Sequence, residues 1–377
     1  MPEPRLPAML DDLRELVCCE SFSADHAAVA RSAEVVAALG ARLLGTAPQT
    51  LVSGGVTHLR WRFGSPRVLL LGHHDTVWPM GSLASHPWSL DGGIARGPGV
   101  LDMKAGLVQL FHALATLPTL DGVCVLVNGD EEVGSPTSRQ LIEETARDCA
   151  ATFVLEAAAD GSGTLKTARK GTGRYEIVVH GKAAHAGQEP HRGVNAAVEA
   201  AHQVLALAGL RPTDTGTTVT PTLLTAGTSR NTVPARARLA VDVRVPDLAA
   251  QRQVDALLRG LAARTPGARL EVLGGSRRPP MEPASSAALF ALAGELAAAL
   301  GQEPPRGTAV GGASDGNYTA AVGCPTLDGL GAVGGGPHAD TEHVEVAWMV
   351  PRARLLAALV ERTRTGTGGR HLPAKAV

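Results

Sequence analysis

The hydrophobic pattern of the chain changes twice, and this limits the folds that are open to it. Up to Lys170, apolar runs alternate with segments of helical spacing. The run Arg67–Leu71 is apolar after its first residue, which is typical of a strand buried inside a parallel sheet. Similar apolar runs lie at 123–127 and 152–155, and segments of helical spacing lie at 104–117 and 140–148. This alternation predicts an α/β layer with a mixed, mostly parallel sheet flanked by helices.

The segment 171–278 follows a different pattern. Its strand-like runs alternate between polar and apolar residues, as half-exposed strands do. The order of elements is β-α-β-β-α-β over about 105 residues, which predicts a small antiparallel α+β unit. The first pattern then returns, with helices near 286–300 and 349–363. We therefore predict one α/β domain, 1–170 and 279–377, with the second domain inserted into it.

The composition argues against two classes of function. Lys plus Arg number 35 and Asp plus Glu number 36, so a net charge of −1 leaves no basic excess to neutralise the phosphates of a nucleic acid. No segment approaches the roughly 20 apolar residues that span a bilayer. The first residues do not have the pattern of a signal peptide, and the five cysteines include no C-x-x-C pair. We expect a cytoplasmic protein with neither a nucleic-acid nor a membrane partner.

The motif Gly72-His73-His74-Asp75-Thr76 directly follows the first apolar run. Side chains alternate in an extended segment, so His73 and Asp75 project to the same side. A His that binds a metal usually donates its other ring N–H to an oxygen, often a carboxylate. His73 as a ligand with Asp75 as its partner is therefore coherent, although His-x-Asp also occurs in loops that bind no metal.

Several acids lie where predicted strands end or a helix begins. Asp102 stands where a glycine-rich loop becomes a helix, so it could instead be a helix N-cap. Glu131 and Glu132 follow the apolar strand 123–127, and Glu156 ends the strand 152–155. Open α/β sheets bind their ligands at the carboxyl ends of strands. A solvated acidic turn is the alternative interpretation of Glu131 and Glu132.

One further histidine completes a set with the chemistry of a metal site. His338 lies in a glycine-rich loop, and glycine allows close approach of a backbone to another group. With His73, Asp102, Glu132 and Glu156 it makes two imidazoles and three carboxylates without a thiol, which suits zinc. Three carboxylates carry −3, so one Zn²⁺ leaves −1, and two leave +1, which a hydroxide neutralises. Two metals therefore fit better than one, and Glu131 is available as a general base.

These residues and their order resemble the M20 family of co-catalytic metallopeptidases, most closely its glutamate carboxypeptidase branch. The similarity extends from about residue 60 to about residue 360. It rests on ordered motifs: Gly72-His73-His74-Asp75-Thr76-Val77, Gly97-Pro98-Gly99 with Asp102-Met103-Lys104, Asp130-Glu131-Glu132-Val133-Gly134-Ser135, Glu156, Lys182-Ala183-Ala184-His185-Ala186-Gly187 and Gly336-Pro337-His338.

The resemblance implies a zinc exopeptidase-like domain at 1–170 and 279–377. It also implies a ferredoxin-like lid and dimerisation domain at 171–278. Two Zn²⁺ ions per subunit are implied, with Co²⁺ or Mn²⁺ as possible substitutes.

Roles in the metal centre also follow from the resemblance. Asp102 would bridge the two ions, and the remaining ligands would divide into the pairs His73 with Glu156 and Glu132 with His338. Asp75 would orient His73, and Glu131 would act first as general base and then as general acid. A cis peptide bond is implied at Asp102–Met103.

The implied lid carries the remaining site residues. His185 would reach into the site of the partner subunit of a homodimer and stabilise the oxyanion. Asn231 and Arg244 would hold the terminal carboxylate of a small substrate, since Arg can bind a carboxylate through two parallel hydrogen bonds. Arg278 matches a further basic position of the carboxypeptidase branch, and its neighbour Arg277 is the alternative match. Gly312 matches a glycine-rich loop near the site, where Ser314 replaces the family's usual Thr.

The implied reaction is hydrolysis of an amide or peptide bond to release a C-terminal amino acid, with glutamate favoured. The first alternative is an N-acyl-amino-acid deacylase of the aminoacylase, acetylornithine deacetylase or succinyl-diaminopimelate desuccinylase type. More remote alternatives are an amide-forming biosynthetic enzyme and a non-catalytic binding protein with the same fold.

Overall fold

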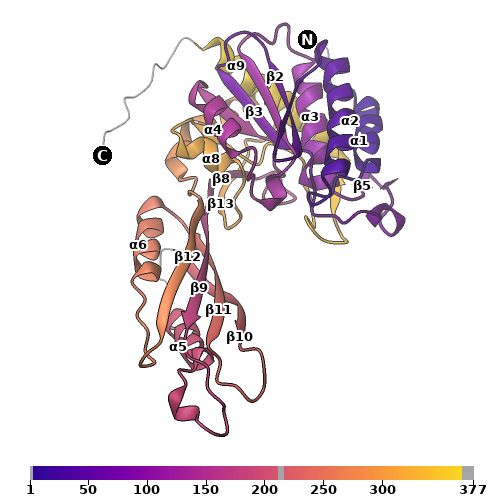
Figure 1. Ribbon diagram of the computed structural model, residues 1–377. Coiled ribbons are helices and arrows are strands. Elements are labelled where there is room, and N and C mark those ends of the chain that lie inside the picture. Colours follow the sequence, from indigo (N-terminus) through magenta and orange to yellow (C-terminus); the bar gives the residue numbers. More distant parts are fainter. Residues whose placement is uncertain (1–2, 211–215, 367–377) are drawn as a thin grey trace. The chain divides into compact units, whose positions relative to one another are not determined.

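The computed structural model describes residues 3–210 and 216–366 and divides into two compact units (Figure 1). Unit 1 comprises Met1–Ala168, Glu282–Val310 and Ser314–Val377, and unit 2 comprises Arg169–Met281 with Gly311–Ala313. Among the described residues, no helix is both long and apolar enough to cross a membrane.

Unit 1 contains a sheet of six strands in the order β1-β2-β6-β3-β7-β14. The central strands β6, β3 and β7 run parallel to one another, as does the edge strand β14 to β7, whereas β1 and β2 pair antiparallel at the other edge. The bounds are β1 Gln49–Ser53, β2 Val56–Arg62, β3 Val68–His73, β6 Val123–Asn128, β7 Ala151–Val154 and β14 Thr326–Leu327. The predicted mixed, mostly parallel sheet is confirmed; β1 and β2 were not predicted.

Alternate side chains of β3 pack into two separate cores, because successive residues of a strand point to opposite faces. Leu70 contributes to the larger core with helices α1, α2, α3, α7 and α9, whereas Leu69 and Leu71 face α4 and α8. Figure 1 shows α1–α3 and α4 on opposite sides of β3. These helices are α1 Leu6–Cys18, α2 His26–Leu44, α3 Ala105–Leu114, α4 Arg139–Arg147, α7 Ala287–Ala299, α8 Gly316–Ala321 and α9 Met349–Thr365.

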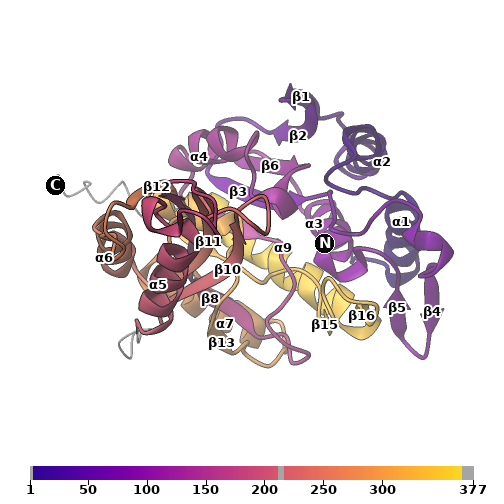
Figure 2. The same cartoon turned by 60° about the horizontal axis from the view of Figure 1, so that its bottom comes forward.

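Two smaller sheets complete unit 1. One has the strand order β15-β16-β5-β4 and brings the chain near residue 340 beside the chain near residue 95 (Figure 2). Its strands are β4 Ser89–Asp91, β5 Ile94–Arg96, β15 Gly334–Gly335 and β16 His343–Glu345. The other pairs β13 Gly307–Val310 with β8 Leu165–Arg169.

Unit 2 has the predicted β-α-β-β-α-β order and an antiparallel sheet with the strand order β10-β11-β9-β12. Its elements are β9 Gly171–His180, α5 Ala196–Ala208, β10 Thr218–Ala226, β11 Arg236–Val245, α6 Leu248–Arg259 and β12 Arg269–Arg278. Ile177 and Val241 of the sheet pack with Leu207 of α5 and Leu258 of α6 in one core, so both helices cover the same face. This is the expected ferredoxin-like arrangement.

Candidate metal centre

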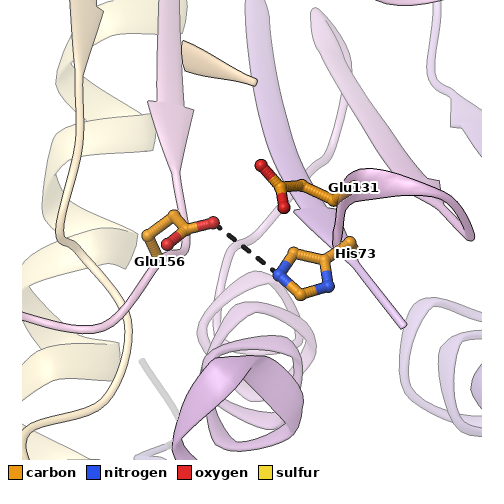
Figure 3. Close-up of side chains that lie close together, drawn as sticks. All are labelled: His73, Glu131 and Glu156. Atoms are coloured by element: carbon orange, nitrogen blue, oxygen red, sulfur yellow. Dashed lines mark ion pairs between the residues drawn. The ribbon is translucent and has the colours of Figure 1, made fainter. Parts of the chain in front are cut away.

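Three neighbouring parallel strands bring acids and a histidine to one edge of the large sheet. His73 is the last residue of β3, Glu131 and Glu132 lie in the turn after β6, and Glu156 lies two residues after β7. Because β6, β3 and β7 are parallel and adjacent, their carboxyl ends meet at the same edge. The side chains of His73, Glu131 and Glu156 point toward one another there (Figure 3).

Asp102 reaches this edge from a turn at Val100–Lys104 that has non-helical backbone angles at Asp102 and Met103. The peptide bond between these two residues is cis, as the family resemblance implies. Helix α3 begins only at Ala105, and its N-cap, Lys104, makes no capping hydrogen bond through its side chain. Asp102 is therefore not an N-cap, and its carboxylate is available to the site.

The Asp102 carboxylate lies between two imidazoles, with one oxygen toward each. Its Oδ1 is 3.1 Å from Nε2 of His73, and its Oδ2 is 3.3 Å from Nε2 of His338. The His73 Nε2 is also 3.7 Å from Oε1 of Glu156, and the His338 Nε2 is 3.2 Å from Oε2 of Glu132. The five predicted ligands thus meet in one cluster, although they come from segments distributed over most of unit 1.

The charges of this cluster favour a bound cation. Hydrogen bonds to Asp102 and Glu132 raise the pKa of His338 to about 10, so excess negative charge holds a proton there. For His73, burial favours a lower pKa, but hydrogen bonds to Asp102 and Asp75 raise it well above the ordinary value. In the described part of the chain, the buried Oε1 of Glu132 has no hydrogen-bond partner. Histidines, carboxylates and an unsatisfied oxygen together fit divalent metal ions.

Asp75 is fully buried and connects His73 to the acidic turn. The Nδ1 of His73 is 3.0 Å from the backbone oxygen of Asp75 and 3.5 Å from its carboxylate Oδ1. A neutral ring with its proton on Nδ1 would keep this contact and leave the Nε2 lone pair for a metal in the site. The Asp75 carboxylate also accepts the backbone N–H groups of Glu131 and Glu132, at 3.1 and 3.2 Å. Asp75 is thus placed to orient the predicted base and one predicted ligand as well as His73.

Glu131 is buried beside the predicted ligands. One of its carboxylate oxygens lies within 4.8 Å of ligand atoms of His73 and Glu156, and a second group with the same spacing joins His73, Asp102 and Glu132. Both groups differ from the pairs that the resemblance implies. Distance alone therefore does not distinguish the base Glu131 from a ligand.

The other predicted residues all lie in unit 2. His185 is exposed, and its Nδ1 accepts the backbone N–H groups of Gly187 and Gln188 at 3.2 and 3.1 Å. Asn231 accepts the Ala186 N–H through its backbone oxygen, at 2.9 Å, which joins the loops of Asn231 and His185.

Arg244 and Gly312, two other predicted substrate-binding positions, also have hydrogen-bond partners within unit 2. Arg244 forms two hydrogen bonds with Asp242, at 2.9 and 3.2 Å. The backbone oxygen of Gly312 accepts a hydrogen bond from Arg169, at 3.1 Å. Arg278 is buried at the end of β12. Their roles toward a substrate stay predictions.

Two residues near the centre were not predicted from the sequence. Lys166 places its Nζ 3.9 Å from Oε2 of Glu156. Glu342 accepts the backbone N–H of Asp102 at 3.0 Å. Neither residue belongs to a motif that could have identified it from the sequence. The one signal for Glu342 is its position four residues after the predicted ligand His338.

Comparison with known proteins identifies the class to which this centre belongs. The family model "Peptidase family M20/M25/M40" matches residues 69–362, so the chain belongs to this family. Proteins of the family are metal-dependent hydrolases, and the residues described above fit that chemistry.

Two relatives support the assignment, and a solved structure shares the fold. Carboxypeptidase G2 of Pseudomonas sp. (strain RS-16) is 31% identical over 374 residues, covering 93% of this chain and 88% of that protein. A succinyl-diaminopimelate desuccinylase of Gluconacetobacter diazotrophicus is 30% identical over 324 residues, covering 79% and 81%. The structure of a tripeptidase from Staphylococcus aureus matches with a TM-score of 0.76 at 20% identity, covering 97% of this chain and 100% of that one.

The cluster predicts a stability change that does not depend on catalysis. A metal that binds only the folded chain stabilises it by about 2.7 kcal/mol at 100 times its Kd. Adding Zn²⁺ to metal-free protein should therefore raise the midpoint temperature of unfolding by several degrees, and Asp102→Ala should abolish most of the rise. Differential scanning calorimetry measures both. Glu303→Ala, an exposed acid outside the cluster, should respond like the unsubstituted chain; an equal rise in Asp102→Ala would contradict the assignment.

Proposed function

We propose that the protein is a di-metal hydrolase that cleaves the amide bond before a C-terminal amino acid, with glutamate as the favoured product. The main support is the placement of the Asp102 carboxylate between His73 and His338, with Glu131 beside them. The identity of 31% with a carboxypeptidase G2 supports a carboxypeptidase reaction.

His73, Glu156, Glu132, His338 and Asp102 would together hold two Zn²⁺ ions. When bound, such ions polarise the scissile carbonyl and make water a stronger nucleophile at neutral pH. Glu131 would accept a proton on its carboxylate and later return it to the leaving amine. Burial of Glu131, and the hydrogen bond from its backbone N–H to Asp75, hold the base in a fixed position while it does so.

The hydrogen bonds of His185 support the role that the resemblance implies for it. Because its Nδ1 accepts two backbone N–H groups, the ring proton lies on Nε2. That N–H is the donor needed to stabilise an oxyanion.

One of the proposed carboxylate-binding residues already has a carboxylate partner within the protein. Arg244 is already paired with the Asp242 carboxylate, so binding a substrate through it requires an exchange of partners. Asn231, Arg278 and Gly312 complete the set that we propose for the terminal carboxylate of the substrate.

A deacylase acting on N-acyl amino acids is the second candidate. Its support is the identity of 30% with a succinyl-diaminopimelate desuccinylase, close to the 31% of the carboxypeptidase. Both reactions break an amide and leave an amino acid with a free carboxylate. The same cluster could therefore catalyse either reaction, and the two candidates differ only in the substrate that the protein binds.

The role of Glu131 predicts a separation between metal binding and catalysis. Glu131→Gln removes the proton acceptor but keeps the shape of the side chain, so turnover should fall about 10³-fold. Zinc content, measured by elemental analysis, should stay at two per chain. Glu303→Gln is the matched control and should keep both quantities. Unchanged turnover in Glu131→Gln would show that another group is the base, whereas a loss of one zinc would show that Glu131 is a ligand.

The choice of substrate is tested with a panel of amides and zinc-loaded protein. We expect the highest kcat/KM for peptides or folate-like amides that end in glutamate, and at least tenfold lower values for N-acetyl amino acids and N-succinyl-diaminopimelate. A chelator should abolish each activity. The opposite order would establish the deacylase, and no hydrolysis of any of these amides would contradict both candidates.

We also propose that the protein forms a homodimer through unit 2. Strand β10 is an edge strand, and edge strands can pair with another chain. Apolar side chains are exposed on it and on α5: Leu223 is 71% exposed and Leu205 is 70% exposed.

The dimer predicts a difference in mass. Light scattering at micromolar concentration should give twice the mass of one chain. The double variant Leu205→Glu with Leu223→Lys should give a monomer. Leu300→Glu changes a similarly apolar exposed residue of unit 1 and should leave the dimer intact. A monomeric unsubstituted chain would refute the proposal.

A further inference from the structure

Glu342 is a buried acid for which the metal centre described above has no role. It lies four residues after His338 and is only 3% exposed. Its Oε1 accepts the backbone N–H groups of Leu101 and Asp102, at 2.8 and 3.0 Å. Its Oε2 accepts the backbone N–H of Gly99 at 3.1 Å and the indole N–H of Trp78 at 2.6 Å.

These four donors occupy the acceptor capacity of the carboxylate. An ionised carboxylate has about four lone-pair sites, and each oxygen of Glu342 receives two N–H groups. All four donors are neutral, and three belong to the backbone. Hydrogen bonds to a charged acceptor are stronger than those between neutral groups. A buried carboxylate held in this way fixes the position of the chain that surrounds it.

The donors and Glu342 belong to the segments that carry three proposed ligands. Trp78 follows the His73 motif, and the N–H groups of Gly99 and Leu101 precede the proposed bridging ligand Asp102. Glu342 itself is on the loop of His338. One carboxylate therefore joins segments that are 240 residues apart in the sequence.

The backbone around Glu342 has little freedom to adopt another arrangement. Gly99 has φ of 69°, and a Cβ on it would lie 2.4 Å from Cγ2 of Thr76. On the other loop, Gly336 has φ of 70°, and a Cβ there would lie 2.6 Å from Oγ1 of Thr341. Both loops thus have the close backbone packing that a fixed separation of Asp102 and His338 requires.

We propose that Glu342 is a positioning residue of the metal centre, which sets the distance between the Asp102 carboxylate and the His338 imidazole by holding the backbone of both segments. This inference rests on the proposed metal centre, and it adds a residue that touches neither metal nor substrate. Its action is greatest on the site of Glu132 and His338, because Glu342 lies on the loop of His338. It contacts the segment of His73 only through the indole of Trp78, five residues after that ligand.

The isosteric variant Glu342→Gln separates positioning from space filling. Its amide keeps the volume of the carboxylate but presents N–H groups where two backbone or indole N–H groups already point. Loss of a partner that orients metal ligands typically lowers metal affinity 10–100-fold. We expect Glu342→Gln to lower the affinity for the second metal ion 10–100-fold, and the affinity for the first ion less than about threefold.

The test is calorimetric titration of metal-free protein with Co²⁺, together with the visible absorption spectrum of the bound cobalt. Glu342→Gln should shift the absorption bands that appear with the second equivalent. Asp340→Asn is the matched control, because it makes the same change of charge on an exposed side chain of the same loop, and it should match the unsubstituted chain. Trp78→Phe removes one of the four donors and should lower the second affinity by about threefold.

Equal affinities and spectra for Glu342→Gln and Asp340→Asn would overturn the proposal. If Glu342→Gln does not fold, Trp78→Phe takes its place, and an unchanged second affinity in that variant would also overturn it. Amide hydrogen exchange of the metal-free protein separates this inference from the proposed function. Because the Gln amide keeps only one acceptor oxygen, Glu342→Gln should lose protection either at Gly99 or at Leu101 and Asp102, whether or not the unsubstituted chain binds two ions. Unchanged protection at all three would count against Glu342 alone.

Discussion

The metal centre depends on one carboxylate that two imidazoles share. Asp102 directs one oxygen to His73 and the other to His338, at 3.1 and 3.3 Å. Burying three carboxylates close together costs free energy unless positive charge compensates them. Protons on the histidines provide part of that charge, as the raised pKa of His338 shows. Two divalent ions would provide it more fully, so the electrostatics of these side chains favour the family's chemistry.

The fold brings these residues together by two different means. Parallel pairing of β6, β3 and β7 places His73, Glu156 and the turn of Glu132 at one sheet edge, and Asp75 holds that turn through two backbone N–H groups. Asp102 and His338 come from loops, where no ladder of strand hydrogen bonds fixes the position. A buried acid fixes them instead, since Glu342 on the loop of His338 holds the turn of Asp102.

This difference explains what the sequence could predict. The apolar strands and the order of elements were predictable because periodicity reports burial directly. The ligand types and the resemblance to a family identified the candidate site. The pairing of Asp75 with His73 was predicted, but the contacts of Asp75 with the turn after β6 and those of Glu342 were not predictable. Their partners are mainly backbone N–H groups, which every residue except proline has. The edge strands β1 and β2 were also missed, and the Asp102 capping alternative was excluded only by the start of α3 at Ala105.

Anomalous X-ray diffraction from zinc-loaded crystals, recorded on both sides of the zinc absorption edge, would locate the ions around Asp102. Two anomalous peaks should lie in unit 1, one beside His73 and Glu156 and the other beside Glu132 and His338, with an Asp102 oxygen on each. A single peak, or a second peak away from Asp102, would contradict a centre built on a shared carboxylate.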